Sequence, residues 1–296
     1  MYDVIIIGGG PAGITAGIYC QRANLKTIIF EKETIGGQIA SSPLVENFPG
    51  CKSISGAQLA TNFYEQADEL GIPIEIEEVL EIIPGEKIKV ITDFGEYESK
   101  VVILATGSKY RLLGLPNEVE YIGKGIAFCT SCDGAFFKGK DIAIIGGGNS
   151  AVTNAIYMSN IAKKIYLVDI CDHLICEKTL EDKLRSLDNV EIIQQTGVKE
   201  LLGDDELNGV ILSNDRKLDI QGMFISIGMV AQTELVKDLV KLNKQNYVDS
   251  EDCKTNLDNI FVAGDCRSKN IRQLTTAVAD GTTAAINAIK YLEDKK

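Results

Sequence analysis

A sequence repeat constrains the fold of this chain more than any other feature. Residues 3–10 read DVIIIGGG, and residues 141–148, 138 positions later, read DIAIIGGG. In each copy a short apolar run leads into a glycine-rich turn, and a segment expected to be helical follows, from Pro11 to about Ala23 in the first copy. This is the order of strand, turn and helix in a dinucleotide-binding unit. The repeat therefore predicts two α/β units of the same kind.

The first copy carries a complete phosphate-binding pattern. Gly8, Gly10 and Gly13 fill G-x-G-x-x-G, and the next apolar run, residues 27–30, ends at Glu31. In such a unit the glycines let the backbone approach a pyrophosphate at the helix N-terminus, and the acid accepts a hydrogen bond from a ribose hydroxyl. The first copy therefore predicts a dinucleotide site.

The second copy keeps the same register. It has Gly146, Gly148 and Ala151, and its second apolar run, residues 164–168, ends at Asp169, again 138 positions after its counterpart. Two such patterns in register predict an α/β fold with two Rossmann-like, three-layer dinucleotide-binding domains. The second copy either binds a nucleotide or keeps the fold without the ligand.

Composition excludes several classes of protein. The net charge is −12 and there is no run of Lys or Arg, so nucleic acid is not an expected partner. His173 is the single histidine, which leaves no multi-histidine metal site, and no metal is predicted. No apolar run reaches membrane-spanning length, and the N-terminal residues lack the basic segment of a signal peptide. A cytoplasmic protein without a membrane segment is expected.

Cys129 and Cys132 form the one C-x-x-C motif among eight cysteines. This spacing allows a small disulfide ring and lowers the pKa of one thiol, as in redox-active pairs. The alternative is half of a zinc site, but Cys171 and Cys176 have the wrong spacing to complete it, and His173 stands alone. Redox chemistry is therefore favoured.

With these motifs the chain resembles the low-molecular-weight, bacterial-type thioredoxin reductases over essentially its whole length. The matching segments occur in the family's order: residues 8–13 (GGGPAG), 36–38 (GGQ), 45–50 (VENFPG), 105–108 (ATGS), 129–134 (CTSCDG), 146–151, 262–265 (VAGD) and 272–273 (RQ).

The resemblance implies that the first unit binds FAD. The residues it places at the cofactor are Gly8, Gly10, Pro11, Ala12, Gly13, Glu31, Gly37, Gln38, Asn47, Ala105, Thr106, Gly107, Gly264, Asp265, Arg272 and Gln273. Of these, Asp265, Arg272 and Gln273 would return from the C-terminal segment to the ribityl and isoalloxazine portions. The resemblance further implies a homodimer and a discontinuous FAD domain, residues 1–111 plus 243–296, with residues 112–242 inserted as an NAD(P)H-like domain that carries the C-x-x-C.

The resemblance also implies roles for the redox centre. Cys132 would face the flavin and exchange electrons with it, and Cys129 would attack the disulfide of thioredoxin or a thioredoxin-like protein. Asp133 would be the acid that protonates the departing thiolate. The residues alone leave a second interpretation of Asp133 open, that of a turn former before Gly134.

The sequence departs from the family where NADPH is bound. Family members that use NADPH carry a basic cluster after the second strand of the inserted domain, but residues 169–175 read DICDHLI, without Lys or Arg. Asp169 and Asp172 would repel a 2′-phosphate. In this respect the chain resembles the ferredoxin-dependent flavin thioredoxin reductases, so reduced ferredoxin is the predicted electron donor. NADH remains the alternative, because Asp169 stands where an acid accepts from a 2′-hydroxyl.

Two other functions stay open at this point. One is a small-molecule dithiol oxidase on the same scaffold, with oxygen as electron acceptor, a class that also lacks the arginine cluster. The other is a flavoprotein redox sensor or interaction module, which the combination of C-x-x-C and flavin motifs disfavours. The leading prediction is an FAD-dependent thioredoxin reductase.

Overall fold

The computed structural model describes residues 1–42 and 44–295, and the chain forms two compact units. Unit 1 comprises Met1–Lys109 and the segment from Val230 to the C-terminal end, and unit 2 comprises Tyr110–Met229. Each unit contains a parallel sheet with helices, so the predicted α/β class with two Rossmann-like domains is confirmed. The polar stretch 241–246, which follows the return of the chain, lies within unit 1.

Unit 1 is built on a seven-stranded sheet. Its strands are β1 (Tyr2–Ile7), β2 (Thr27–Glu31), β3 (Ile74–Ile76), β4 (Val79–Ile83), β5 (Ile88–Thr92), β6 (Glu96–Leu104) and β17 (Ile260–Val262), and its helices are α1 (Pro11–Arg22), α2 (Gly56–Glu69) and α6 (Leu274–Asp294). The parallel strands run in the order β3-β2-β1-β6-β17, and β5 and β4 continue from β6 as an antiparallel ribbon.

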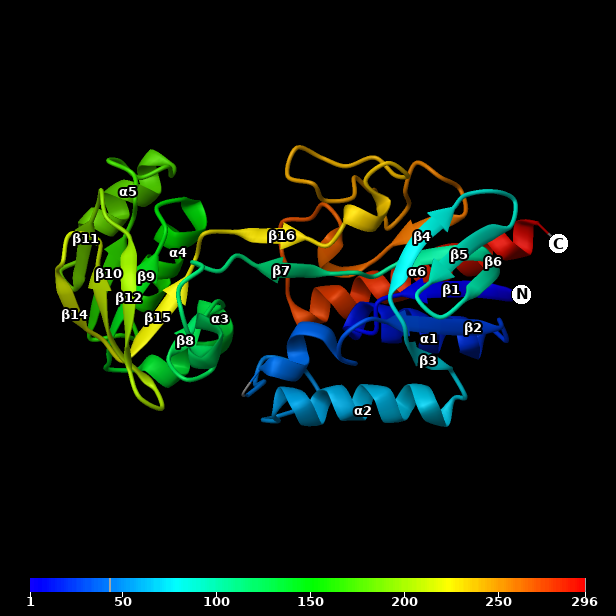
Figure 1. The fold of residues 1–296 in the computed structure, drawn as a ribbon, viewed down its shortest axis with the longest axis horizontal. Helices are drawn as coiled ribbons and strands as arrows, with labels where there is room; N and C mark the ends of the chain where they lie inside the picture. The colour runs from blue at the N-terminus through cyan, green and yellow to red at the C-terminus, as the bar shows by residue number, and fades with distance from the viewer. Residues whose placement is uncertain (43, 296) are drawn as a thin grey trace. The chain divides into compact units, whose positions relative to one another are not determined.

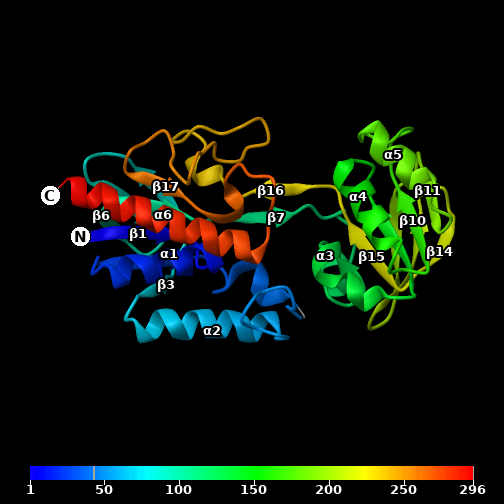
Figure 2. The same cartoon turned by 180° about the vertical axis from the view of Figure 1, so that it is seen from behind.

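The central strand β1 shows why the first apolar run forms a parallel strand. Val4 and Ile6 pack into one hydrophobic cluster together with residues of α1, α2 and α6, whereas Ile5 and Ile7 pack into the cluster on the opposite face. None of the four side chains is more than 6% exposed. A strand buried on both faces needs helices or loops on each side. Figures 1 and 2 show α1, α2 and α6 gathered along one side of the sheet.

Unit 2 repeats this plan. Its strands are β8 (Ile126–Ala127), β9 (Asp141–Ile145), β10 (Lys164–Val168), β11 (Val190–Ile193), β12 (Val198–Gly203), β13 (Leu207–Leu212), β14 (Lys217–Asp219) and β15 (Gly222–Ile225), and its helices are α3 (Thr130–Asp133), α4 (Asn149–Met158) and α5 (Lys178–Arg185). The parallel sheet has the order β11-β10-β9-β15-β8, and β12, β13 and β14 form a separate antiparallel sheet. Ile142 and Ile144 of β9 pack on one face, and Ala143 and Ile145 on the other.

The chain crosses between the units twice, in β7 (Ser108–Tyr110) and β16 (Met229–Ala231), and these two strands pair with each other. After the first crossing, the nearly buried carboxylate of Glu118 accepts hydrogen bonds from the backbone N–H groups of Leu113, Gly114 and Leu115 at 2.7, 2.8 and 3.2 Å. One carboxylate therefore fixes the start of unit 2. Within residues 1–42 and 44–295, every helix is too short or too polar to span a bilayer.

Candidate functional site

Cys129 and Cys132 form a disulfide in unit 2, with an S–S distance of 2.10 Å and Cα atoms 5.2 Å apart. Strand β8 ends two residues before Cys129, which is the N-cap of the one-turn helix α3. The carbonyl of Cys129 accepts hydrogen bonds from the N–H groups of Cys132, at 3.2 Å, and Asp133, at 2.9 Å. The turn thus holds both sulfurs together, as the C-x-x-C spacing predicts, and Asp133 is the next residue of the chain.

The surroundings of Asp133 favour the protonated form of its carboxyl. Its Oδ1 is buried and has no hydrogen-bond partner in the described part of the chain. Burial raises the pKa of this carboxyl from its ordinary value of 3.8 to about 6. Its side chain makes no capping hydrogen bond to the 3-10 turn Gly134–Phe137 that follows, which weighs against the role of a turn former. This carboxyl, on the residue directly after the disulfide, therefore binds a proton more readily than an ordinary Asp does.

Three polar side chains that the sequence analysis did not single out anchor the disulfide turn. Thr130 Oγ1 donates to Asn154 Oδ1 of α4 at 2.8 Å, and Asn154 Nδ2 donates to Ser226 Oγ at 2.9 Å. These residues are 24 and 72 positions apart in the sequence, so no local spacing indicates the connection. The chain of hydrogen bonds ties α3 to α4 and to the residue after β15.

The first glycine turn lies between β1 and α1, as predicted. Gly8 has φ +115°, and a Cβ there would lie 2.2 Å from the carbonyl oxygen of Ala105, so no larger residue fits. A Cβ on Gly10, by contrast, would have no atom within 4 Å. Gly10 is the N-cap residue of α1, and no side chain caps this helix terminus. Glu31 Oε2 accepts from the N–H of Gly9 at 2.7 Å. The acid therefore lies beside the turn.

Other predicted cofactor residues gather at the same helix terminus. A Cβ on Gly37 would lie 3.4 Å from Cα of Gly10, and a Cβ on Gly264 would lie 2.9 Å from Cβ of Ala12. Pro11 occupies the first helical position of α1. Segments from three parts of the sequence thus meet at the N-terminus of α1.

Four other predicted cofactor residues contact one another in pairs within unit 1. Asn47 Nδ2 lies 3.5 Å from Gln273 Oε1, and Arg272 Nε donates to the carbonyl of Asp265 at 3.4 Å. Figures 1 and 2 place the segment around residue 273 at the start of α6.

Gln38 and Thr106 contact the chain close to where it crosses between units. Gln38 Nε2 donates to the carbonyl of Ser108 at 2.6 Å, and Thr106 Oγ1 donates to the carbonyl of Gln232 at 2.5 Å. The neighbouring Gly107 has φ +71°.

These residues fit FAD. Free N–H groups at the N-terminus of the twelve-residue helix α1, beside the open position at Gly10, suit the pyrophosphate, and the Glu31 carboxylate suits a ribose hydroxyl. Arg272, which donates to the carbonyl of Asp265, and the adjacent Gln273 supply charged and amide groups. When bound, FAD would supply two-electron redox chemistry.

The second glycine turn differs from the first at its acid. A Cβ on Gly147 would lie 2.0 Å from Asp169 Oδ2, so this carboxylate packs directly against the backbone of the turn. Asp169 is 7% exposed. Its Oδ2 and the Oγ1 of Thr196 are buried without hydrogen-bond partners among the residues the structure describes, although Thr196 N donates to the Asp169 carbonyl at 3.2 Å. The Ile175 N–H donates to the Gly147 carbonyl at 2.9 Å, which folds the following loop over the turn.

Three of the other cysteines are buried and are poor nucleophiles. Burial raises the pKa of the Cys20 and Cys253 thiols to about 12, and it raises the pKa of the Cys266 thiol as well. Thiolates are scarce at such sites near neutral pH. Among the described residues, no group of three His, Cys, Asp or Glu side chains is arranged to hold a metal ion.

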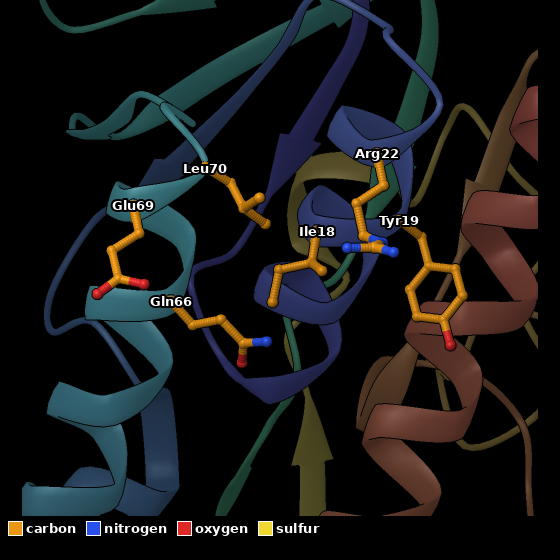
Figure 3. A pocket seen from close by; sticks show the side chains of 6 residues that line it. All are labelled: Ile18, Tyr19, Arg22, Gln66, Glu69 and Leu70. Atoms are coloured by element: carbon orange, nitrogen blue, oxygen red, sulfur yellow. The ribbon is translucent and has the colours of Figure 1, made fainter.

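A surface pocket lies away from all these residues. Figure 3 shows it between the C-terminal halves of α1 and α2. The residues that line it are Ile18, Tyr19, Arg22, Gln66, Glu69 and Leu70. No predicted site residue is among them, because the predicted cofactor residues of α1 occupy its opposite end.

Known proteins resemble this chain over its full length. The family model described as pyridine nucleotide-disulphide oxidoreductase matches residues 2–281. A 34.2 kDa protein in the rubredoxin operon of Clostridium pasteurianum is 43% identical, with 99% of this chain and 98% of that protein covered. The thioredoxin reductase of Bacillus subtilis is 37% identical, with 99% and 96% covered. The crystal structure of thioredoxin reductase from Streptococcus pyogenes has a TM-score of 0.94 at 39% identity, covering 99% of both chains. This chain therefore belongs to the pyridine nucleotide-disulphide oxidoreductase family.

Proposed function

We propose that this chain is an FAD-dependent reductase that passes electrons through its Cys129–Cys132 disulfide to thioredoxin or a thioredoxin-like protein. The observation that carries the proposal is the disulfide in unit 2 with the buried, easily protonated Asp133 directly after it. The likeness to proteins named thioredoxin reductase from B. subtilis and S. pyogenes, over 99% of the chain, supports the same substrate.

The proposed exchange balances as two electrons and two protons. The Cys129 thiolate attacks the disulfide of the partner protein and forms a mixed disulfide, and one partner thiolate leaves. The Cys132 thiolate then attacks the Cys129 sulfur, which re-forms the Cys129–Cys132 disulfide and releases the partner as a dithiol. Of the two protons that the released dithiol carries, Asp133 gives one to a departing thiolate and solvent supplies the other. The two electrons that reopen the disulfide for the next cycle would come from the reduced form of FAD.

Reduction by dithionite tests this proposal independently of the physiological donor. The reduced protein, freed of excess dithionite, should reduce thioredoxin. Cys129→Ser and Cys132→Ser should each abolish turnover and leave the yellow flavin spectrum in place. Cys51→Ser, which alters a half-buried cysteine outside the disulfide, serves as the matched control. Turnover retained by both disulfide variants would refute the mechanism.

We propose reduced ferredoxin as the electron donor. The support is the segment 169–175, which offers no Lys or Arg to a 2′-phosphate and instead presents Asp169 and Asp172. In the same segment the side chains of Ile170 and Ile175 are 75% and 65% exposed. NADPH is therefore not the proposed donor.

One observation favours NADH as a second candidate. Asp169 Oδ2 and Thr196 Oγ1 are buried polar atoms without partners in the described chain, and Asp169 lies next to an intact glycine turn. Buried polar groups are normally satisfied, and a ribose diol would supply the missing hydrogen bonds. The arrangement suits an adenosine without a 2′-phosphate.

Stopped-flow absorbance with NADPH, NADH and reduced ferredoxin, each added separately, distinguishes the donors. Rapid bleaching of the flavin by ferredoxin and not by NADH supports the first proposal. Rapid bleaching by NADH, slowed in Asp169→Asn and unchanged in Asp172→Asn, supports the second. Rapid bleaching by NADPH would refute the interpretation of residues 169–175.

One outcome would replace this proposal by another function. Fast peroxide production from dithiols, without reduction of thioredoxin, would identify a small-molecule dithiol oxidase.

We also propose a homodimer as the working state. Sedimentation equilibrium of the FAD-loaded protein tests it, and a single species with the 32.1 kDa mass of one chain would refute it.

A further inference from the structure

Four nearly buried charged side chains form a network in unit 1, behind the segment that leads into α6. Lys269 Nζ lies 3.2 Å from Asp265 Oδ1 and 2.9 Å from Asp280 Oδ2, and an Arg267 guanidinium nitrogen lies 2.7 Å from Asp280 Oδ1. None of these side chains is more than 21% exposed. Two carboxylates and two cations balance, so the network carries no net charge.

The network holds a segment that has little regular structure of its own. Between the 3-10 turn Gly264–Cys266 and α6, the chain has no helix or strand. Asp280, inside α6, accepts from the N–H of Gly264 at 3.2 Å through the same carboxylate that binds Lys269. The start of the segment is thereby attached to the rigid helix.

Lys269 is the member of the network that joins both carboxylates. Its ammonium group donates hydrogen bonds to Asp280 Oδ2 at 2.9 Å and to Thr276 Oγ1 at 3.3 Å, and it forms an ion pair with Asp265 Oδ1. Asp265 Oδ1 is buried and makes no hydrogen bond within the described part of the chain, so the Lys269 charge is what compensates it there. Asp265 therefore has a defined position relative to α6.

We propose that Lys269 is a positioning residue of the flavin site, which orients the Asp265 carboxylate by linking it to Asp280. The inference rests on the proposed placement of Asp265 at the flavin. It assigns Lys269 no contact with the cofactor, because its ammonium group is already surrounded by protein acceptors. Loss of the ammonium leaves Asp265 and Asp280 with Arg267 as their one remaining cationic partner in the network, and the two carboxylates then repel each other.

A double-mutant cycle on FAD affinity tests the proposal. The dissociation constant is measured by titrating apoprotein with FAD and following the quenching of flavin fluorescence. Lys269→Met and Asp265→Asn should each raise the constant by about tenfold, and the double variant should be no weaker than the weaker single variant. Lys237→Met, which removes a surface ion pair with Glu234, is the matched control and should leave the constant unchanged.

The outcomes separate two kinds of failure. If Asp265→Asn leaves both the FAD dissociation constant and the flavin midpoint potential unchanged, the placement of Asp265 at the flavin is wrong. If Asp265→Asn weakens binding and Lys269→Met adds a further tenfold loss in the double variant, Lys269 does not act through Asp265 and the inference is overturned. Should the Met variant fail to fold, Lys269→Gln replaces it in the same cycle.

Discussion

Replacing Asp133 by Asn should make the oxidised protein more stable and catalytically poorer. Burial raises the pKa of this carboxyl from 3.8 to about 6, so the folded protein keeps the proton over a range of pH where the unfolded chain has lost it. Ionisation of such a group costs stability, and a shift of roughly two units corresponds to about 3 kcal/mol. The cost is nearly absent below pH 4, grows as the pH rises through about 6, and is complete above pH 7.

Asn cannot ionise and therefore lacks this cost. The free energy of unfolding of Asp133→Asn should exceed that of the parent protein by up to about 3 kcal/mol at pH 7.5, and by about half as much at pH 5. Urea unfolding followed by far-UV circular dichroism at both pH values measures the difference. Asp172→Asn is the control, because Asp172 is exposed and the pKa of its carboxyl is lowered by His173, so it should show no such gain.

The same variant should reduce its partner protein about a hundredfold more slowly in a single turnover, because the amide cannot donate the proton of a carboxylic acid. A stability difference that does not grow between pH 5 and pH 7.5 would refute the reasoning on burial. An undiminished rate would refute the assignment of Asp133 as the acid.

Three other substitutions have defined outcomes. Gly147→Ala places a methyl group 2.0 Å from Asp169 Oδ2, so it should lower the melting temperature in calorimetry and leave the FAD content unchanged; an unaltered melting curve would contradict the geometry. Glu118→Gln leaves backbone donors poorly satisfied and should cost about 1–3 kcal/mol in urea unfolding. Tyr247→Leu removes the ring that lies 3.9 Å from the Arg272 guanidinium and should weaken FAD binding by about threefold in fluorescence titration. Equal affinity would show that the ring does not orient Arg272.

The sequence predicted the architecture because each unit is organised by local signals. The apolar run, glycine turn and terminal acid lie within about thirty residues, a distance over which strand and helix patterns are set by neighbouring residues. Gly8, Gly146 and the C-x-x-C turn could therefore be placed from the sequence.

Contacts between distant segments could not be predicted in this way. The bonds of Asn154 to Thr130 and Ser226, and of Asp280 to Arg267 and Lys269, depend on how helices pack on sheets and loops. A polar residue within a helix gives no sign in the sequence of which partner it meets. The sequence also could not predict that Asp169 Oδ2 is buried without a hydrogen-bond partner among the described residues, because it shows an acid but not the burial of that acid.

The matching strand orders of the two units bear on where the disulfide lies. In unit 1 the last strand of the parallel sheet is β17, from the end of the chain, and in unit 2 the same place is taken by β8, from the unit's beginning. Gly264 follows β17 by two residues, and Cys129 follows β8 by two residues. The two units therefore place different chemistry at the same point of the same strand order: a glycine turn in unit 1 and a disulfide in unit 2. The redox pair needs no strand beyond those that the shared plan already provides.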